Sequence, residues 1–438
     1  MRKTWLILFT VPLMCLAAPL QLSLKRAVEM AVSPEGNTNI QLSGEALKQA
    51  QARSAESRAA LLPDLEASVT GQSRTENLAA LGIQVVVPIP GFRFPTFVGP
   101  FSTFDARATA TQSVFDFSSI RRYQASKVGV SAAKSDTRNT DEQVAAQVAR
   151  AYLAAVKADA DVETAQSNVT LSDALLTQAN NQKTAGTGTG IEITRARVQL
   201  ANDRQQLLVA QNARRAAHLQ LLRVMGLRLD TEIDLTDRLE YAPVDAITLD
   251  QARHQALAER ADLEAQQRRE ENARLSASAT KLERVPSLAA FGDYGSIGTG
   301  LDSSLPTRTI GFQLKVPVFD GGRRDAQRVE SASQYRAEKT RTNDLKQQVE
   351  LDVRLALDEL QSADDQVKVS KDGLDLSQNE LAQARRRYEG GVANSLEVTD
   401  AQTRLERARA NQTAALYAYN VARIDLAQAM GRVRAAVQ

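Results

Sequence analysis

The chain has 438 residues and a formal net charge of +2, with 24% charged and 43% hydrophobic residues. This composition excludes a disordered chain and a bundle of membrane helices, and the balanced charge gives no reason to expect nucleic acid as a partner. The only histidines are His218 and His254, and the only cysteine is Cys15. Disulfide frameworks, haem attachment, zinc clusters and Cys–His nucleophile pairs are therefore excluded or nearly so, and we expect no metal and no cofactor.

Residues 1–17 are expected to form a cleaved export signal. Arg2 and Lys3 precede an apolar run from Trp5 to Leu16, and small residues follow at the expected cleavage point after Ala17. A retained N-terminal anchor and a lipid attached at Cys15 are the alternatives. After this segment no apolar stretch approaches the length of a membrane helix. A membrane-embedded part would therefore have to consist of β-strands.

The remaining chain reads as a duplicated unit, with repeats at 18–226 and 227–438. The sequence Val-Phe-Asp at 114–116 recurs at 318–320, and Met-Gly at 225–226 recurs at 430–431. The order of the matched segments is the same in both halves. Each repeat is expected to run through helices, a strand, a loop, a second strand, a very long helix, a turn and a long helix.

Two strands are expected in each repeat, at about 64–76 and 103–117 and at about 287–297 and 308–319. Apolar and polar residues alternate along them, for example in the run from Ile310 to Val318. This alternation predicts one apolar and one polar face, and about ten residues suffice for a tilted strand to cross a bilayer. The connection at about 77–102 carries four prolines and is too long for a tight hairpin.

Long coiled-coil helix pairs are expected at about 118–226 and 321–431. Small and apolar residues recur there at alternating steps of four and three, as in Val349, Val353, Ala356, Leu360 and Ala363. A sustained seven-residue repeat predicts left-handed helix packing. The chain reverses at glycine-containing turns around Gly186 and Gly391.

Four bilayer-length strands cannot close a barrel, and open strand edges cannot sit in lipid. Three chains would supply about twelve strands, an even count within the known range, and would ring about twelve long helices into a tube. The fold class expected is a mixed α+β membrane protein in which a twelve-strand barrel continues into a helical coiled-coil barrel.

The mature chain resembles the TolC-type outer membrane efflux proteins. The marks are Leu61-Leu62-Pro63, both Val-Phe-Asp sequences, Gly321-Gly322 after the second one, and Tyr388-Glu389-Gly390-Gly391. The resemblance implies a homotrimer in the outer membrane lipid, with its helical part in the periplasm. It also implies no enzymatic activity, and export of drugs, metabolites or proteins together with an inner-membrane pump and a periplasmic adaptor, in efflux or type I secretion.

The resemblance also carries candidate site residues. Glu397 and Asp400 match the two carboxylates that ring the periplasmic end of the pore, and their spacing of three places them on one helix face. An ordinary solvated face is the alternative. Tyr388 and Glu192 match the polar network that closes the resting tip, but Ala393 stands where an arginine is expected. The turns at Gly186 and Gly391 match the adaptor-docking tips.

Two other functions compete with the channel. A periplasmic adaptor or structural coiled coil would share the long helices and the export signal, but it should lack the duplicated strand pairs. A hydrolase that acts through carboxylates alone is compatible with the composition, although no motif in the sequence indicates one.

Overall fold

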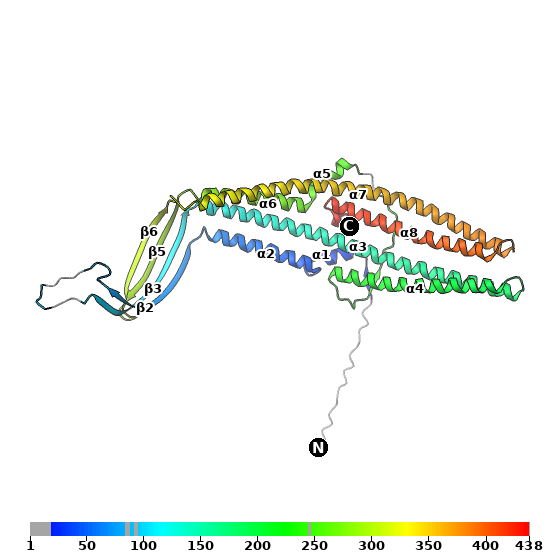
Figure 1. Ribbon diagram of the computed structural model, residues 1–438, viewed down its shortest axis with the longest axis horizontal. Coiled ribbons are helices and arrows are strands. Elements are labelled where there is room, and N and C mark those ends of the chain that lie inside the picture. Colours follow the sequence, from blue (N-terminus) through cyan, green and yellow to red (C-terminus); the bar gives the residue numbers. More distant parts are fainter. Residues whose placement is uncertain (1–18, 84–87, 92–94, 244–246, 438) are drawn as a thin grey trace, which may run out of the picture. The chain divides into compact units, whose positions relative to one another are not determined.

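The computed structural model describes residues 19–83, 88–91, 95–243 and 247–437 (Figure 1). The expected signal peptide, with Cys15, lies outside these residues. The chain forms two compact units. We call them the helical unit (the described residues of 1–45, 136–262 and 345–438) and the sheet unit (the described residues of 46–135 and 263–344). Each unit takes segments from both predicted repeats, because equivalent segments of the two repeats pack together.

The helical unit is built around two antiparallel helix hairpins (Figure 1). The first hairpin consists of α4 (Gly190–Met225) and the adjoining part of α3 (Phe117–Thr184), and the second of α8 (Ser395–Ala429) and the adjoining part of α7 (Arg323–Glu389). Shorter helices complete the unit: α1 (Leu24–Val32), the start of α2 (Thr38–Ala59), α5 (Leu249–Glu259) and α9 (Val433–Val437). None of the described helices is sufficiently long and apolar for a membrane crossing.

The core of the helical unit uses the predicted heptad positions. Val349 and Val353 are fully buried, and so is the equivalent first-repeat residue Val148. The hydroxyl of buried Tyr152 donates to the carbonyl oxygen of Leu22 at 2.8 Å. This bond holds the short strand β1 (Leu20–Leu22), which pairs in parallel with β4 (Ile233–Leu235), against the helices.

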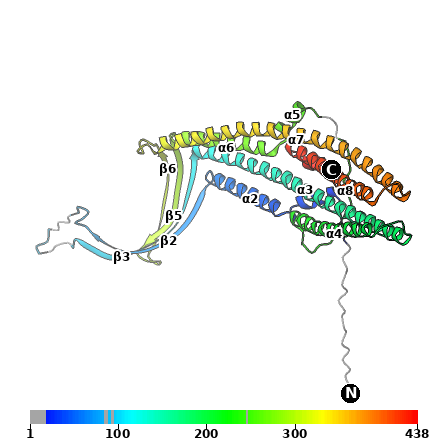
Figure 2. The same ribbon diagram turned by 45° about the vertical axis from the view of Figure 1, so that its right-hand side comes forward.

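The sheet unit contains one four-stranded antiparallel sheet (Figure 2). Its strands follow the order β2 (Asp64–Asn77), β3 (Phe97–Phe115), β5 (Ser287–Gly298) and β6 (Leu305–Lys315). Each repeat supplies one hairpin, and the two hairpins join where β3 pairs with β5. Strands β2 and β6 are the outer strands of the sheet. Most of α6 (Ala261–Leu282) belongs to this unit as well.

Two predicted strand boundaries are wrong. Strand β3 begins at Phe97 rather than near 103, so part of the expected connection pairs with β2. Strand β6 ends at Lys315 rather than near 319. Apolar alternation continues to Val318, but Pro317 has no N–H to donate to a ladder, and the backbone leaves the sheet before it.

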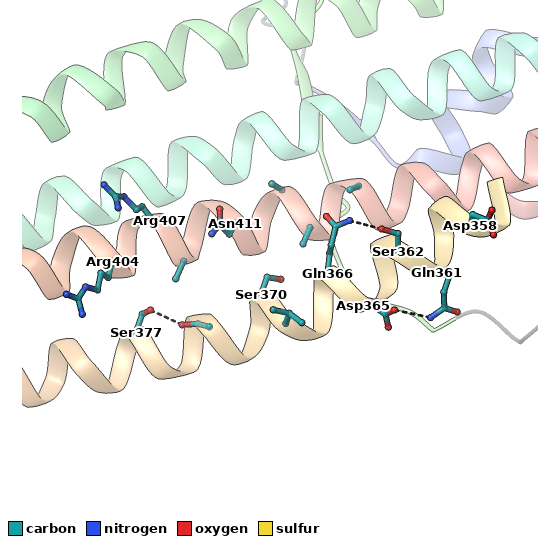
Figure 3. Close-up of a pocket in the computed structure, with 16 residues that line it drawn as sticks. Asp358, Gln361, Ser362, Asp365, Gln366, Ser370, Ser377, Arg404, Arg407 and Asn411 are labelled. Atoms are coloured by element: carbon teal, nitrogen blue, oxygen red, sulfur yellow. Dashed lines mark hydrogen bonds between the residues drawn. The ribbon is translucent and has the colours of Figure 1, made fainter. Parts of the chain in front are cut away.

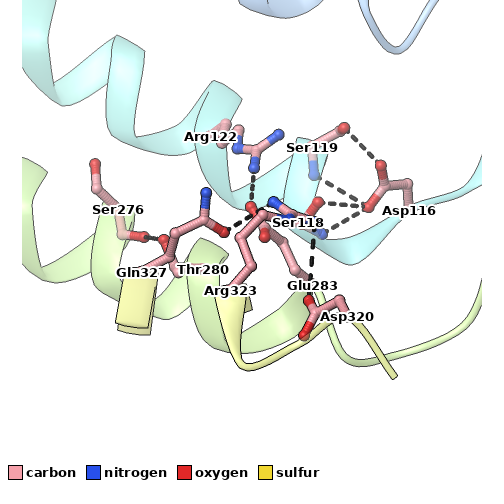
Figure 4. A network of polar contacts seen from close by, with 10 residues as sticks. All are labelled: Asp116, Ser118, Ser119, Arg122, Ser276, Thr280, Glu283, Asp320, Arg323 and Gln327. Atoms are coloured by element: carbon pink, nitrogen blue, oxygen red, sulfur yellow. Dashed lines mark hydrogen bonds and ion pairs between the residues drawn. The ribbon is translucent and has the colours of Figure 1, made fainter. Parts of the chain in front are cut away.

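The repeated Val-Phe-Asp sequences end in carboxylates that begin the two longest helices. Asp116 accepts hydrogen bonds from the backbone N–H groups of Ser118 at 2.9 Å and Ser119 at 3.3 Å (Figure 4). In the second repeat Asp320 accepts from the N–H of Arg324 at 3.3 Å. A side-chain acceptor at this position satisfies N–H groups that have no partner within the helix. The duplicated motif thus acts as a helix cap.

Candidate functional site

The two hairpin turns have the same local geometry. Gly186 and Gly391 have φ angles of +77° and +71°, which an L-residue adopts only with strain. At both turns the glycine N–H bonds back to the preceding helix, to Lys183 and Tyr388 respectively, at 3.1 Å. A side chain at either glycine would find no atom within 4 Å. The turns therefore present open backbone at the ends of the hairpins.

Glu192, the predicted acidic member of the gate, serves its own helix. Its carboxylate accepts from the backbone N–H of Thr189 at 2.8 Å, at the start of α4. This contact is half of a capping box, which stabilises a helix N-terminus. At the start of α8, Asn394 performs the equivalent task by accepting from the N–H groups of Leu396 and Glu397. Glu192 is thus engaged within the first hairpin.

Tyr388, the other predicted gate residue, is buried without a hydrogen bond. Its side chain belongs to a buried apolar cluster that includes Leu381, Val398 and Leu405. Among the described residues its hydroxyl has no hydrogen-bond partner. Burial, followed by the negative charge of Glu192, raises the pKa of the Tyr388 hydroxyl. The structure brings the two predicted gate residues together around a small cavity of about 30 Å³ but does not bond them to each other.

The predicted constriction residues Glu397 and Asp400 lie on an exposed face of α8, and both are paired with arginines. The Nε of Arg387 lies 2.9 Å from a carboxylate oxygen of Glu397. Arg404 contacts Asp400 and also Glu380, whose carboxylate oxygen lies 2.6 Å from Nη1. The cluster contains three carboxylates and two guanidinium groups, so its net charge is −1. Glu397 and Asp400 without their partners would carry −2.

A long groove runs along the second hairpin on the side of α7 and α8 shown in Figure 3, with a volume of about 1240 Å³. Small residues such as Gly373, Ala408 and Ala415 line it, and polar side chains including Gln366 and Asn411 border it (Figure 3). A row of small residues permits close approach of another helix. The groove thus offers a helix-packing surface that the described part of the chain leaves open.

A closed ring of hydrogen bonds joins the hairpins at a position that the sequence analysis missed. Ser172 of α3 donates to Asp203 of α4, and Gln402 of α8 donates to the Ser172 hydroxyl at 2.6 Å. Gln402 also donates to Glu406 at 3.0 Å. Gln199 completes the ring by donating to Asp203 at 3.1 Å and to Glu406 at 3.5 Å. Ser172, Asp203 and Gln402 are buried.

No sequence motif marks the ring, because its members are ordinary polar residues on three different long helices. A usable signal exists in the spacing. Ile193, Leu200 and Asp203 follow the heptad steps, and the position equivalent to Asp203 in the second repeat is the buried Ala408. A carboxylate at a seam position of one repeat, with alanine at the equivalent position of the other, indicates a buried polar contact.

One face of the four-stranded sheet is apolar and exposed. The strand register aligns Leu65, Ala110, Gly292 and Ile310 in a row across all four strands. The exposed fractions of Leu65, Ile310 and Phe312 are 77%, 83% and 74%. Exposed apolar surface of this extent marks a surface that contacts lipid or another protein.

The opposite face of the sheet is polar. Its adjacent row consists of Glu66, Thr109, Asp293 and Thr309. On the same face the guanidinium of Arg107 lies 3.1 Å from Asp293 and 2.8 Å from Asp105. The two faces of the sheet therefore differ in chemical character, one apolar and one polar. No group of three or more potential metal-ligating side chains occurs in the described part of the chain.

Comparison with known proteins agrees with this architecture. The model of the outer membrane efflux protein family matches residues 35–227 and 252–432. The alkaline protease secretion protein AprF of Pseudomonas aeruginosa is 22% identical over 327 residues, which are 73% of this chain and 68% of AprF. The pyoverdine export outer membrane protein OpmQ of Pseudomonas putida is 25% identical over 395 residues, which are 88% of this chain and 81% of OpmQ.

Solved channels share the fold. The outer membrane protein VceC of Vibrio cholerae superposes with a TM-score of 0.78 at 18% identity, covering 93% of this chain and 96% of VceC. The outer membrane channel CmeC of Campylobacter jejuni gives 0.79 at 17% identity, covering 93% of this chain and 85% of CmeC. The family match spans most of both repeats, and these structures confirm the expected combination of a β domain with long paired helices, while the twelve-strand count stays a prediction. The chain therefore belongs to the outer membrane efflux protein family, the TolC-type channels that the sequence resembles.

Proposed function

We propose that this protein is the subunit of a passive exit duct, which carries substrates out of the cell when an inner-membrane pump drives them through a periplasmic adaptor. The observation that carries the proposal is the two-faced sheet, joined through the same chain to two long helix hairpins. An apolar face suits lipid and a polar face suits a water-filled passage. A protein confined to the periplasm has no use for an apolar face of this extent.

The open edges of the sheet support a trimer. Strands β2 and β6 each have one edge that pairs with no other strand in the described part of the chain. Such edges cannot face lipid because their backbone groups would lack hydrogen-bond partners. Joining β6 of one copy to β2 of the next hides both edges, and three copies give twelve strands. The groove along the second hairpin then receives a helix of the neighbouring copy. The hairpins would form a tube in the periplasm.

The hairpin tips are proposed as the adaptor-docking sites. The turns at Gly186 and Gly391 present exposed backbone with space around them. Glu397 and Asp400, paired with their arginines, are proposed to face the pore just inside the tip. The duct carries out no reaction of its own, and the pump is the source of energy.

The membrane part of the proposal is tested by paired substitutions on adjacent residues of β6. Ile310→Arg places a charge on the apolar face, at a cost of about 2–4 kcal/mol near the middle of a bilayer. Thr309→Arg adds the same side chain to the polar face. We expect Ile310→Arg to abolish heat-modifiable trimers in the outer membrane, whereas Thr309→Arg leaves them intact. Equal tolerance of both variants, or recovery of a soluble monomer from the periplasm, contradicts the duct.

A further inference from the structure

Hydrogen bonds cross between the two hairpins in the ring formed by Ser172, Gln199, Asp203, Gln402 and Glu406. Within the described part of the chain, the predicted gate residues at the tip make no such crossing bond. Gln402 of the second hairpin donates to Ser172 of the first. Gln199 of the first hairpin reaches Glu406 of the second. At the tip, in contrast, the Tyr388 hydroxyl has no partner among the described residues, Glu192 caps its own helix, and Ala393 has no polar side chain.

A neighbouring hydrogen bond adds to the contact between the two hairpins. Arg409 of α8 donates to the side-chain oxygen of Asn168 of α3 at 3.0 Å. Any movement of the second hairpin away from the first must break this bond and the Gln402–Ser172 bond together. The ring is largely buried, so its polar groups would remain without partners until water enters. A buried polar group that loses its hydrogen-bond partner costs free energy, so the hydrogen bonds of this contact are expected to break together rather than one at a time.

We propose that this ring is the latch that holds the two hairpins together in the resting duct, and that protonation of Glu406 tightens it. The proposal rests on the proposed duct function. It assigns the inter-hairpin contact to residues about halfway between the turns and the core of the helical unit, rather than to the tyrosine and acid at the tip.

The proton sensitivity follows from the surroundings of Glu406. The charged groups that act on it are Asp203, from the facing helix α4, and Arg409, from its own helix. Its hydrogen-bond partners are the neutral side chains of Gln402 and Gln199. Burial, and then the negative charge of Asp203, raises the pKa of Glu406 above its ordinary value of 4.5 in the latched structure. The hydrogen bond from Gln402, the positive charge of Arg409 and the hydrogen bond from Gln199 lower the pKa, but they offset the rise only in part.

The sign of the pH effect is fixed by this shift. In an opened duct water reaches Glu406, so its pKa falls toward the ordinary value. The latched state therefore binds the proton more tightly than the open state does, and acid favours the latch. The latch is at full strength below about pH 4.5 and weakens as the pH rises through the higher pKa of the latched state.

The chain offers a matched control for the crossing bond. Gln412, also on α8, accepts a hydrogen bond from Ser370 of α7 at 2.7 Å, entirely within the second hairpin. Gln402→Ala removes a glutamine–serine bond between hairpins, whereas Gln412→Ala removes one inside a hairpin. The purified trimers are compared in planar lipid bilayers by open probability at pH 7.5 and pH 5, with heat-modifiable migration as the check on assembly.

We expect Gln402→Ala to raise the open probability at pH 5 roughly tenfold, the effect of leaving one buried partner unsatisfied, while Gln412→Ala matches the wild type. The wild type should open less at pH 5 than at pH 7.5. Glu406→Gln, which is neutral at both values, should lose this dependence, whereas Glu163→Gln on the exposed face of α3 should keep it.

The results distinguish failure of the latch from failure of the proposed duct. Should Gln402→Ala not assemble, Gln402→Asn, which shortens the side chain by one carbon, and Ser172→Ala replace it. If the wild type conducts and these variants open no more often than Gln412→Ala, the latch is refuted and the duct stands. A wild type that forms no channel refutes the duct, and the latch with it. A pH response that persists in Glu406→Gln refutes the assignment of the proton.

Discussion

Arg404 is expected to set the charge of the candidate constriction, because it neutralises two carboxylates at once. Its guanidinium contacts Asp400 and Glu380, and all three side chains are about half exposed. Arg404→Gln changes the net charge of the surrounding cluster from −1 to −2 in each copy, or from −3 to −6 in a trimer. Because exposed ion pairs contribute less than about 1 kcal/mol each, the folded trimer should survive the change.

The expected effect on ion selectivity follows from Coulomb's law. One added charge about 10 Å from a permeating ion in water contributes about 0.4 kcal/mol, so three copies contribute about 1.2 kcal/mol. Screening over a Debye length of about 10 Å at 0.1 M salt reduces this sum to about 0.4 kcal/mol. Cation occupancy of the constriction should then rise about twofold, and anion occupancy should fall by a similar factor.

The assay is the reversal potential of single channels in a KCl gradient. Arg404→Gln should move it toward cation selectivity, and the double variant Glu397→Ala with Asp400→Ala should move it the other way. Arg228→Gln is the control. Arg228 lies far along the chain from both hairpin turns, and its guanidinium is 2.6 Å from the carboxylate of the exposed Asp230. Equal reversal potentials for Arg404→Gln and Arg228→Gln would show that this face of α8 does not line the constriction.

The remaining predictions concern the turns and the caps. Gly391→Trp should abolish pump-dependent resistance while heat-modifiable trimers still form, since a side chain there is strained but meets no atom within 4 Å; full resistance would argue against docking at this turn. Asp116→Ala should cost about 1–2 kcal/mol of stability at pH 7 through loss of a helix cap, measured by thermal unfolding. Burial raises the pKa of the Asp116 carboxyl, but hydrogen bonds from Ser118 and Ser119 outweigh burial and lower it below the usual 3.8, so the difference between the variants should shrink as the pH falls below about 4. A difference that is constant with pH would contradict the capping role.

The heptad pattern was sufficient to predict the long helices, because the seam residues recur every seven residues, about two helical turns, and this spacing can be read from residues close together in the chain. Their observed bounds, 117–184 with 190–225 and 323–389 with 395–429, follow the predicted pairs closely. The ends of the strands were harder to predict. Alternation in sequence continues through Val318, but Pro317 cannot donate a ladder hydrogen bond, so the strand stops at Lys315.

Periodicity and duplication were enough to indicate the strand pairs and the long helices, and the resemblance of short motifs indicated the family, because each of these signals can be read directly from the order of residues in the chain. The partners of individual charged side chains depend instead on residues hundreds of positions away. The sequence does not show which cations lie beside Glu397 and Asp400, and in the folded chain both carboxylates are paired with arginines. Ser172 and Gln402 lie 230 residues apart, and they meet only because the two repeats pack their hairpins against each other.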